Sequence, residues 1–181
     1  MPYLKPLVRY VLVPVFLLFV SCVKDVDLEQ ANEIVIPPTV AVDIVYFTLH
    51  SDQFYPANTT GPRMAEDVVR LEFLDDDYIQ DGLVRAELNY SFTNTFTNPI
   101  QAEIVFLSEN NSERYRTSLL IPGGSPEDPG VVDFTEILEG QDLAAFKKAI
   151  KMRLDLEMYS GAGTEEGQLQ LKSSAILKLE F

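Results

Sequence analysis

Apolar and polar residues alternate along most of the chain after residue 39. The clearest example is the segment 150–158, in which every even position is apolar and every odd position is charged. A period of two places one face of a β-strand against a core and the other in water. Similar alternation recurs in the segments 69–73, 83–92, 100–106, 115–121 and 169–181, and the segment 40–49 is apolar at nearly every position. We therefore predict at least seven strands. Val84 is expected on the core face of the strand at 83–92, and Phe181 on the core face of the strand at 169–181.

Turn-forming residues separate these segments, as at 98–99, 109–112 and 160–163. Strands do not alternate with long helices, so the pattern favours two packed antiparallel sheets over a parallel sheet. One short helix is predicted from Asp142 to Lys148, because Asp142 can cap it and Leu143, Phe146 and Ile150 share a face. The predicted fold is an all-β, antiparallel, immunoglobulin-like β-sandwich over residues 39–181, with this helix at one end.

The amino terminus has the pattern of a signal peptide. Two basic residues, Lys5 and Arg9, precede an uncharged apolar run of ten residues from Val11 to Val20. A membrane-spanning helix needs roughly 20 apolar residues, so this run is too short to span the bilayer. It matches the apolar region of a secretory signal peptide that is cleaved from the mature protein.

The sequence Phe19-Val20-Ser21-Cys22 follows this run and contains the only cysteine of the chain. It resembles the lipobox of bacterial lipoproteins, although the first position holds Phe where Leu is usual. The resemblance covers residues 1–22. It implies cleavage after Ser21, lipidation of the Cys22 thiol and a mature chain held to a membrane by its acylated amino end. The alternative is an ordinary signal peptide with an incidental cysteine.

Residues 22–38 are predicted to form a flexible tether, because they lack periodicity and end in Pro37-Pro38. Lys24 and the acidic residues that follow it resemble the export signal of surface lipoproteins in the Bacteroidota. A solvated acidic tether explains the same residues equally well. We therefore expect a lipid-anchored protein of the outer membrane. The cell surface is slightly favoured, and the periplasmic face stays open.

Composition excludes several classes of partner and site. The chain has 14 Lys and Arg against 28 Asp and Glu, a net charge of −14, which argues against binding nucleic acid or anionic lipid through charge. One Cys and one His exclude a multi-cysteine zinc site and a His-pair metal site. The sequence predicts no cofactor.

The segment 75–82 is the best candidate for a metal site. Carboxylates at Asp75, Asp77 and Asp81 are of the type that binds Ca²⁺, but Ile79 stands where an EF-hand needs an oxygen ligand. The interpretation that the sequence favours is an acidic hairpin loop between strands 68–74 and 83–95, with the turn at Asp81-Gly82.

Evidence for catalysis is weak. His50 is the only imidazole, and its neighbours Ser51 and Asp52 do not make a triad by adjacency. The chain has no Trp, and most of its aromatic residues fall on core faces. Three tyrosines near turns are exceptions: Tyr55, Tyr78 and Tyr159. Phe54 and Tyr55 could form a contact patch or fold back over the edge of the sandwich.

These observations favour a non-enzymatic, lipid-anchored protein that acts as an accessory or scaffold subunit of a cell-envelope complex through protein–protein contacts. Its expected partners are the membrane and an outer-membrane or envelope protein. The alternative is a surface module that binds a glycan or another ligand, with assistance from Ca²⁺ at Asp75, Asp77 and Asp81. An envelope hydrolase is the least favoured class.

Overall fold

The computed structural model describes residues 38–54, 62–159 and 166–181. The predicted signal peptide, Cys22 and the tether up to residue 37 lie outside these ranges, as does Tyr55. None of the helices in the described ranges has the length and apolar character needed to cross a bilayer.

The described ranges contain eight strands, two short α-helices and two 3₁₀ turns. The strands are β1 (Thr39–His50), β2 (Pro62–Arg70), β3 (Leu83–Asn94), β4 (Ile100–Leu107), β5 (Glu113–Ile121), β6 (Gly130–Leu138), β7 (Lys151–Tyr159) and β8 (Gln168–Leu179). The helical segments are η1 (Ser51–Gln53), η2 (Glu72–Asp75), α3 (Asp77–Gly82) and α4 (Gly140–Phe146).

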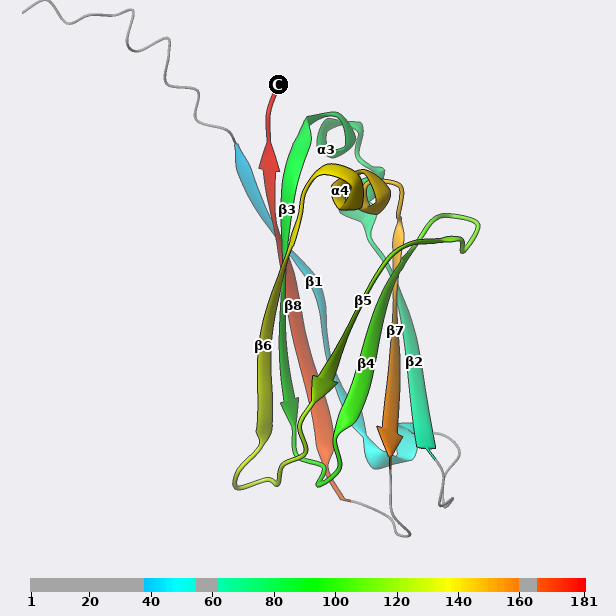
Figure 1. Cartoon of the computed structure of the whole chain (residues 1–181), viewed down its shortest axis with the longest axis vertical. Helices are drawn as coiled ribbons and strands as arrows, with labels where there is room; N and C mark the ends of the chain where they lie inside the picture. Colours follow the sequence, from blue (N-terminus) through cyan, green and yellow to red (C-terminus); the bar gives the residue numbers. More distant parts are fainter. Residues whose placement is uncertain (1–37, 55–61, 160–165) are drawn as a thin grey trace, which may run out of the picture. The chain divides into compact units, whose positions relative to one another are not determined.

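The strands form two antiparallel sheets, with the order β1-β8-β3-β6 in sheet A and β2-β7-β4-β5 in sheet B (Figure 1). The predicted all-β sandwich is therefore confirmed. Consecutive strands mostly change sheet, and β4 and β5 are the one pair in the described chain that are neighbours both in sequence and in a sheet. Two four-stranded sheets connected in this order form a jelly roll, so the likeness to immunoglobulin domains lies in the architecture and not in the connectivity.

Alternate residues of both sheets meet in one core. In β7 the side chains of Met152, Leu154, Leu156 and Met158 are at most 2% exposed, as the alternation predicts. The predicted helix is α4, which runs from Gly140 to Phe146 and begins two residues earlier than expected, so Asp142 lies in its first turn and does not cap it. Phe146 contacts Phe106 edge to face, with ring centroids 5.0 Å apart, and so closes one end of the core.

The predicted hairpin at residues 68–95 is wrong. Strand β2 belongs to sheet B and ends at Arg70, whereas β3 belongs to sheet A, so the two strands do not pair. The segment between them crosses from one sheet to the other as η2 and α3. Leu71 and Leu74 are 2% and 1% exposed. Burial of these side chains holds the crossing against the core, a role that a solvent-exposed turn would not need.

Two further expectations about core faces are corrected. The register of β3 shifts between Leu83 and Arg85, so Leu83 is buried and Val84 is 38% exposed. Strand β8 ends at Leu179, and Phe181 lies beyond it with 74% of its surface exposed. The Phe181 ring stacks on Tyr78 at a centroid distance of 4.4 Å.

Strand β6 was not among the predicted strands because its pattern is partly inverted. Val131 and Ile137 point outward and are 52% and 51% exposed, while the acidic Glu136 points toward the interior, where its carboxylate meets the Tyr115 hydroxyl. A strand with apolar residues outside and a carboxylate inside does not show the periodicity that identifies the others.

Asn94 organises the end of the sandwich opposite α4. Its side chain is fully buried, and its Nδ2 donates to the carbonyls of Asn98 at 3.0 Å and Pro122 at 2.9 Å. Its Oδ1 accepts a hydrogen bond from the Phe96 backbone N–H at 2.9 Å. One buried amide thereby joins the β3–β4 connection to the β5–β6 connection, with every bond satisfied.

A second buried polar group is less well satisfied. The Tyr115 hydroxyl donates to one carboxylate oxygen of Glu136, across the edge between β5 and β6. The other Glu136 oxygen and the hydroxyl of the buried Tyr90 have no hydrogen-bond partner. Burial raises the pKa of Tyr90 well above its ordinary value, and the negative charge of Glu136 adds to this effect. The two tyrosines therefore contribute differently to stability.

We predict opposite consequences when each hydroxyl is removed. Tyr115→Phe should lower the free energy of unfolding by about 1–2 kcal/mol, because it breaks a charge-assisted hydrogen bond. Tyr90→Phe should leave the free energy of unfolding unchanged or raise it by up to about 1 kcal/mol. The hydroxyl that it removes is buried without a hydrogen-bond partner and so destabilises the folded state. Urea denaturation of both variants measures the difference, and a larger loss for Tyr90→Phe than for Tyr115→Phe would contradict the assignment.

Candidate functional site

The outer face of sheet A carries a shallow hollow of about 350 Å³ whose lining residues are mostly polar. Strand pairing places four polar residues in one row across the sheet: Asp43 of β1, Ser174 of β8, Asn89 of β3 and Thr135 of β6. Thr135 Oγ1 donates to Asn89 Oδ1 at 2.7 Å, which fixes the Asn89 amide and leaves its Nδ2 directed elsewhere. This row forms one side of the hollow.

A second row of residues runs parallel to the first. On the two central strands, β8 and β3, its residues lie two positions away from those of the first row. It consists of Tyr46, Lys172, Ser91 and Asp133, which are paired in that order. Tyr46 is 65% exposed, and Lys172 Nζ lies 5.8 Å from the centroid of its ring. A second hollow of about 320 Å³, lined by Asp43, Tyr46 and Lys172, adjoins the first.

The local irregularity of β1 creates this arrangement. The register between β1 and β8 shifts between Asp43 and Val45, and the hydroxyl of the inward-pointing Ser173 accepts a hydrogen bond from the Val45 N–H at 3.2 Å. A bulge redirects the side chains that follow it. Both Asp43, before the shift, and Tyr46, after it, therefore line the outer face.

The charged side chains of these two rows have no ion-pair partner among the described residues. Neither Asp43, Asp133 nor Lys172 takes part in an ion pair there, and the hydroxyls of Ser91 and Ser174 make no side-chain hydrogen bond. Solvent-facing polar groups at fixed cross-strand spacing are available to a ligand without first breaking bonds within the protein.

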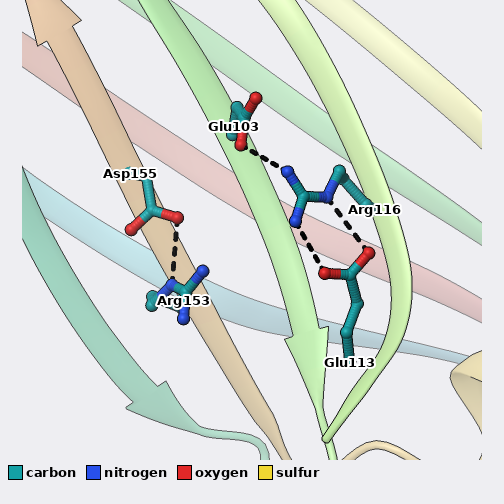
Figure 2. Close-up of polar contacts among 5 residues, drawn as sticks. All are labelled: Glu103, Glu113, Arg116, Arg153 and Asp155. Carbon is teal, nitrogen blue, oxygen red and sulfur yellow. Dashed lines mark hydrogen bonds and ion pairs between the residues drawn. The ribbon is translucent and has the colours of Figure 1, made fainter.

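At the centre of the outer face of sheet B, by contrast, charged side chains are paired with one another (Figure 2). Arg116 of β5 lies between Glu103 and Glu113, with N–O distances of 2.6 Å to each, and Arg153 pairs with Asp155 at 2.9 Å. The hydrogen bond with Arg116 lowers the pKa of Glu113 from its ordinary value. These charges therefore satisfy one another.

The arginines of sheet B also cover an apolar residue. Val105 points outward, because Ile104 and Phe106 on either side of it point into the core, yet it is 0% exposed. It is paired with Arg116 on one side and Arg153 on the other. The aliphatic stems of arginine can shield apolar surface while the guanidinium stays in water. The centre of this face is thus covered by its own side chains.

The acidic segment does not gather its carboxylates into one cluster. Asp75 pairs with the Arg70 guanidinium, and this hydrogen bond raises the pKa of Arg70. Asp77 lies in the first turn of α3 and Asp81 in its last, both exposed. Asp76 accepts from the Tyr78 N–H at 2.8 Å and caps the helix, which explains why this acidic segment is helical. Across the described ranges, no three His, Cys, Asp or Glu residues are grouped as a metal site.

The remaining candidates are dispersed. His50 is exposed at the end of β1, where its backbone N–H donates to Gln53 Oε1 at 2.7 Å. Phe54 is fully buried and contacts Phe96 edge to face at 5.7 Å, so this half of the predicted aromatic patch folds back into the core. Tyr78 and Tyr159 are exposed, 53% and 59%, and neither belongs to the hollow on sheet A.

The sequence did not single out the residues of the hollow. Asp43, Asn89 and Asp133 lie at outward positions of three strands that are separated in the chain. A weak signal exists in β3 and β8, where small polar residues, Ser91 and Ser174, occupy the outward positions at the middle of each strand. Only the pairing of β8 between β1 and β3 brings these positions together.

No protein-family model matches this chain, and no curated protein resembles it significantly. Among solved structures, a "putative secreted protein" from Parabacteroides distasonis ATCC 8503 is similar over 64% of this chain and 38% of its own, with a TM-score of 0.47 and 14% identity.

Two viral proteins are also similar. The VP2 subviral particle of infectious bursal disease virus matches over 80% of this chain and 33% of its own, with a TM-score of 0.49 and 8% identity. The enzymatically active domain of tailspike protein 4 from bacteriophage CBA120 matches over 76% of this chain and 19% of its own, with a TM-score of 0.42 and 10% identity. The chain thus spans well under half the length of each of these three neighbours.

We predict that Ca²⁺ does not stabilise the domain through the acidic segment. A ligand that binds the folded state raises the melting temperature of a protein. Because Asp75 is paired with Arg70, adding millimolar Ca²⁺ should leave the melting temperature of this protein unchanged. Thermal denaturation with Ca²⁺ and with EDTA tests this. A rise in melting temperature that Asp77→Ala abolishes would restore the calcium hypothesis.

Proposed function

We propose that this chain is a non-enzymatic, lipid-anchored protein of the bacterial outer membrane that acts by binding through the outer face of sheet A. The observation that carries the proposal is the contrast between the two outer faces. Arg116 and Arg153 at the centre of sheet B are paired with neighbouring carboxylates, whereas Asp43, Asp133 and Lys172 on sheet A form no ion pair and surround a hollow.

The position of the hollow favours binding over catalysis. It lies on the outside of a sheet, and its polar side chains face water. Catalytic sites gain much of their effect by excluding water and placing charges in a low-dielectric environment. Burial raises the pKa of Tyr90 strongly, but its side chain points into the sandwich and belongs to the core.

The anchor comes from the amino-terminal sequence. Thr39 begins β1 beside Lys178, near the end of β8, so the chain enters sheet A at the end where α3 and α4 lie (Figure 1). A tether that ends at residue 38 would hold the domain by this end. The hollow, near the middle of the sheet, and the loops at the far end then stay accessible.

Substitution of the lipidated residue tests the anchor. Cys22→Ala should move the protein from the membrane fraction to the soluble fraction or leave the signal peptide uncleaved, because no thiol is available for acylation. Val23→Ala is the matched control, since it keeps the thiol and should stay in the membrane fraction. Fractionation and the mass of the mature amino terminus measure both effects. Normal maturation and membrane retention of Cys22→Ala would contradict the anchor.

A second candidate function is the accessory or scaffold subunit that the sequence favours. The observation in its support is strand β6, which forms one edge of sheet A and carries the exposed apolar residues Val131 and Ile137. An edge strand offers unpaired backbone groups to a partner strand, and its outward apolar residues add contact area.

Gentle detergent extraction distinguishes this candidate. With an affinity tag placed between Ser125 and Asp128, a scaffold subunit should bring down a stoichiometric envelope protein. Ile137→Lys should then reduce the recovered partner at least fivefold. Leu120→Lys, at a 60% exposed position on edge strand β5, is the matched control and should not. Loss of the partner in both variants would show that β6 is not the contact, and recovery without any partner would count against a scaffold.

A further inference from the structure

We propose that the two polar rows at the centre of sheet A bind a neutral glycan whose chain lies across the strands. This inference rests on the proposed binding function of sheet A and names the class of ligand. It follows from four features of the two adjoining hollows: an exposed aromatic ring, side chains that offer both donors and acceptors, the spacing of the rows and the balance of charge.

The first feature is the ring of Tyr46. It is 65% exposed on a strand whose other aromatic residue, Phe47, packs against the core. Lys172 reaches over the ring at 5.8 Å, and a flexible lysine can move aside without breaking an ion pair. An aromatic ring with an apolar body and a polar hydroxyl suits the C–H face of a sugar, because the ring packs on the carbons while the hydroxyls stay hydrogen-bonded.

The second feature is the mixture of hydrogen-bonding groups. Asp43 and Asp133 offer acceptors, Lys172 offers donors, and Ser91 offers both. Asn89 Oδ1 is already occupied by Thr135, so its Nδ2 is the group left to donate. Sugar hydroxyls are donors and acceptors at once, so they can satisfy such a surface. A ligand with acceptors only would leave the two carboxylates unpaired, at a cost in desolvation.

The third feature is the geometry of the rows. Neighbouring strands lie about 4.8 Å apart, so a row over four strands spans about 14 Å. The spacing between neighbouring strands is close to the length of one pyranose unit in an extended chain. Each row of four residues therefore matches about three sugar units. Each row has one small side chain on a central strand, Ser174 in the first row and Ser91 in the second. In the second row Tyr46 and Asp133 stand at the two ends, and Lys172 lies between them on β8.

The fourth feature is charge. Two carboxylates and one ammonium line the hollow, in a chain with a net charge of −14. This combination repels a polyanionic glycan and lacks the basic cluster that a phosphate or sulfate would require. It also lacks the deep apolar pocket that anchors the side chains of a peptide. A neutral polysaccharide remains the ligand class that the surface fits.

Isothermal titration calorimetry and thermal shift with the full mature protein in detergent test this proposal. The probes are neutral oligosaccharides of two to six units derived from β-glucan, xylan, mannan and starch, with oligogalacturonate as the acidic comparison. We expect at least one neutral series to bind, with affinity that rises up to about three or four units and then levels off. Oligogalacturonate should bind at least tenfold more weakly.

Variants locate the binding surface. Tyr46→Ala should weaken binding at least tenfold and Tyr46→Phe at most threefold, because stacking needs the ring and not the hydroxyl. Asn89→Ala should also weaken binding. Arg116→Ala on sheet B is the matched control and should bind as the parent does. The melting temperature of Tyr46→Ala should stay close to that of the parent, since its side chain is mostly exposed.

Several outcomes would overturn the glycan assignment. These are the absence of binding to every neutral series, preferred binding of oligogalacturonate, or neutral binding that Tyr46→Ala leaves intact and Arg116→Ala removes. None of them affects the anchor, which the Cys22→Ala fractionation tests separately. Recovery of a protein partner that is lost on substitution of Tyr46 and Asn89 would refute the glycan while keeping sheet A as the binding face.

Discussion

The structure depends on burying one face of every strand between two sheets. Because consecutive strands mostly pass from one sheet to the other, almost every strand pair joins segments that are distant in sequence, such as β1 with β8. Such pairs carry a large loop-closure entropy, and burial of the inward side chains must offset it. The strict alternation in β7 and β8 reflects this requirement, since a slip of one residue would move a whole set of apolar side chains into water.

Buried polar groups fix the connections at the ends and edges of this core. Asn94 satisfies three backbone groups from two connections and so ties one end of the sandwich together. The Tyr115–Glu136 hydrogen bond closes the edge between β5 and β6, and the buried hydroxyl of Tyr90 has no hydrogen-bond partner. These contacts act where alternation alone does not specify the path of the chain.

Once the inner faces are buried, the two outer faces are free to differ. At the centre of sheet B, Arg116 and Arg153 form ion pairs with neighbouring carboxylates and also cover Val105. On sheet A, Asp43, Asp133 and Lys172 form no ion pair around the hollow, and the exposed Tyr46 lines the second hollow beside it. This asymmetry is the basis for assigning recognition to sheet A. It also explains why the acidic excess of the whole chain says little about the ligand: the local arrangement of Asp43, Asp133 and Lys172 determines what fits.

The amino-acid sequence by itself determined the all-β class and the approximate positions of six strands and one helix, and it carries the lipoprotein-like amino terminus on which the proposed anchor rests. These follow from local patterns, namely period-two alternation, turn residues and the run that ends at Cys22. The tertiary structure alone decided the connectivity, the strand β6 with its inward Glu136, the helical crossing at residues 71–82 and the exposure of Val84 and Phe181. It also decided the candidate site, because Asp43, Asn89, Asp133 and Lys172 lie far apart in the chain, and only the pairing of four distant strands makes them neighbours.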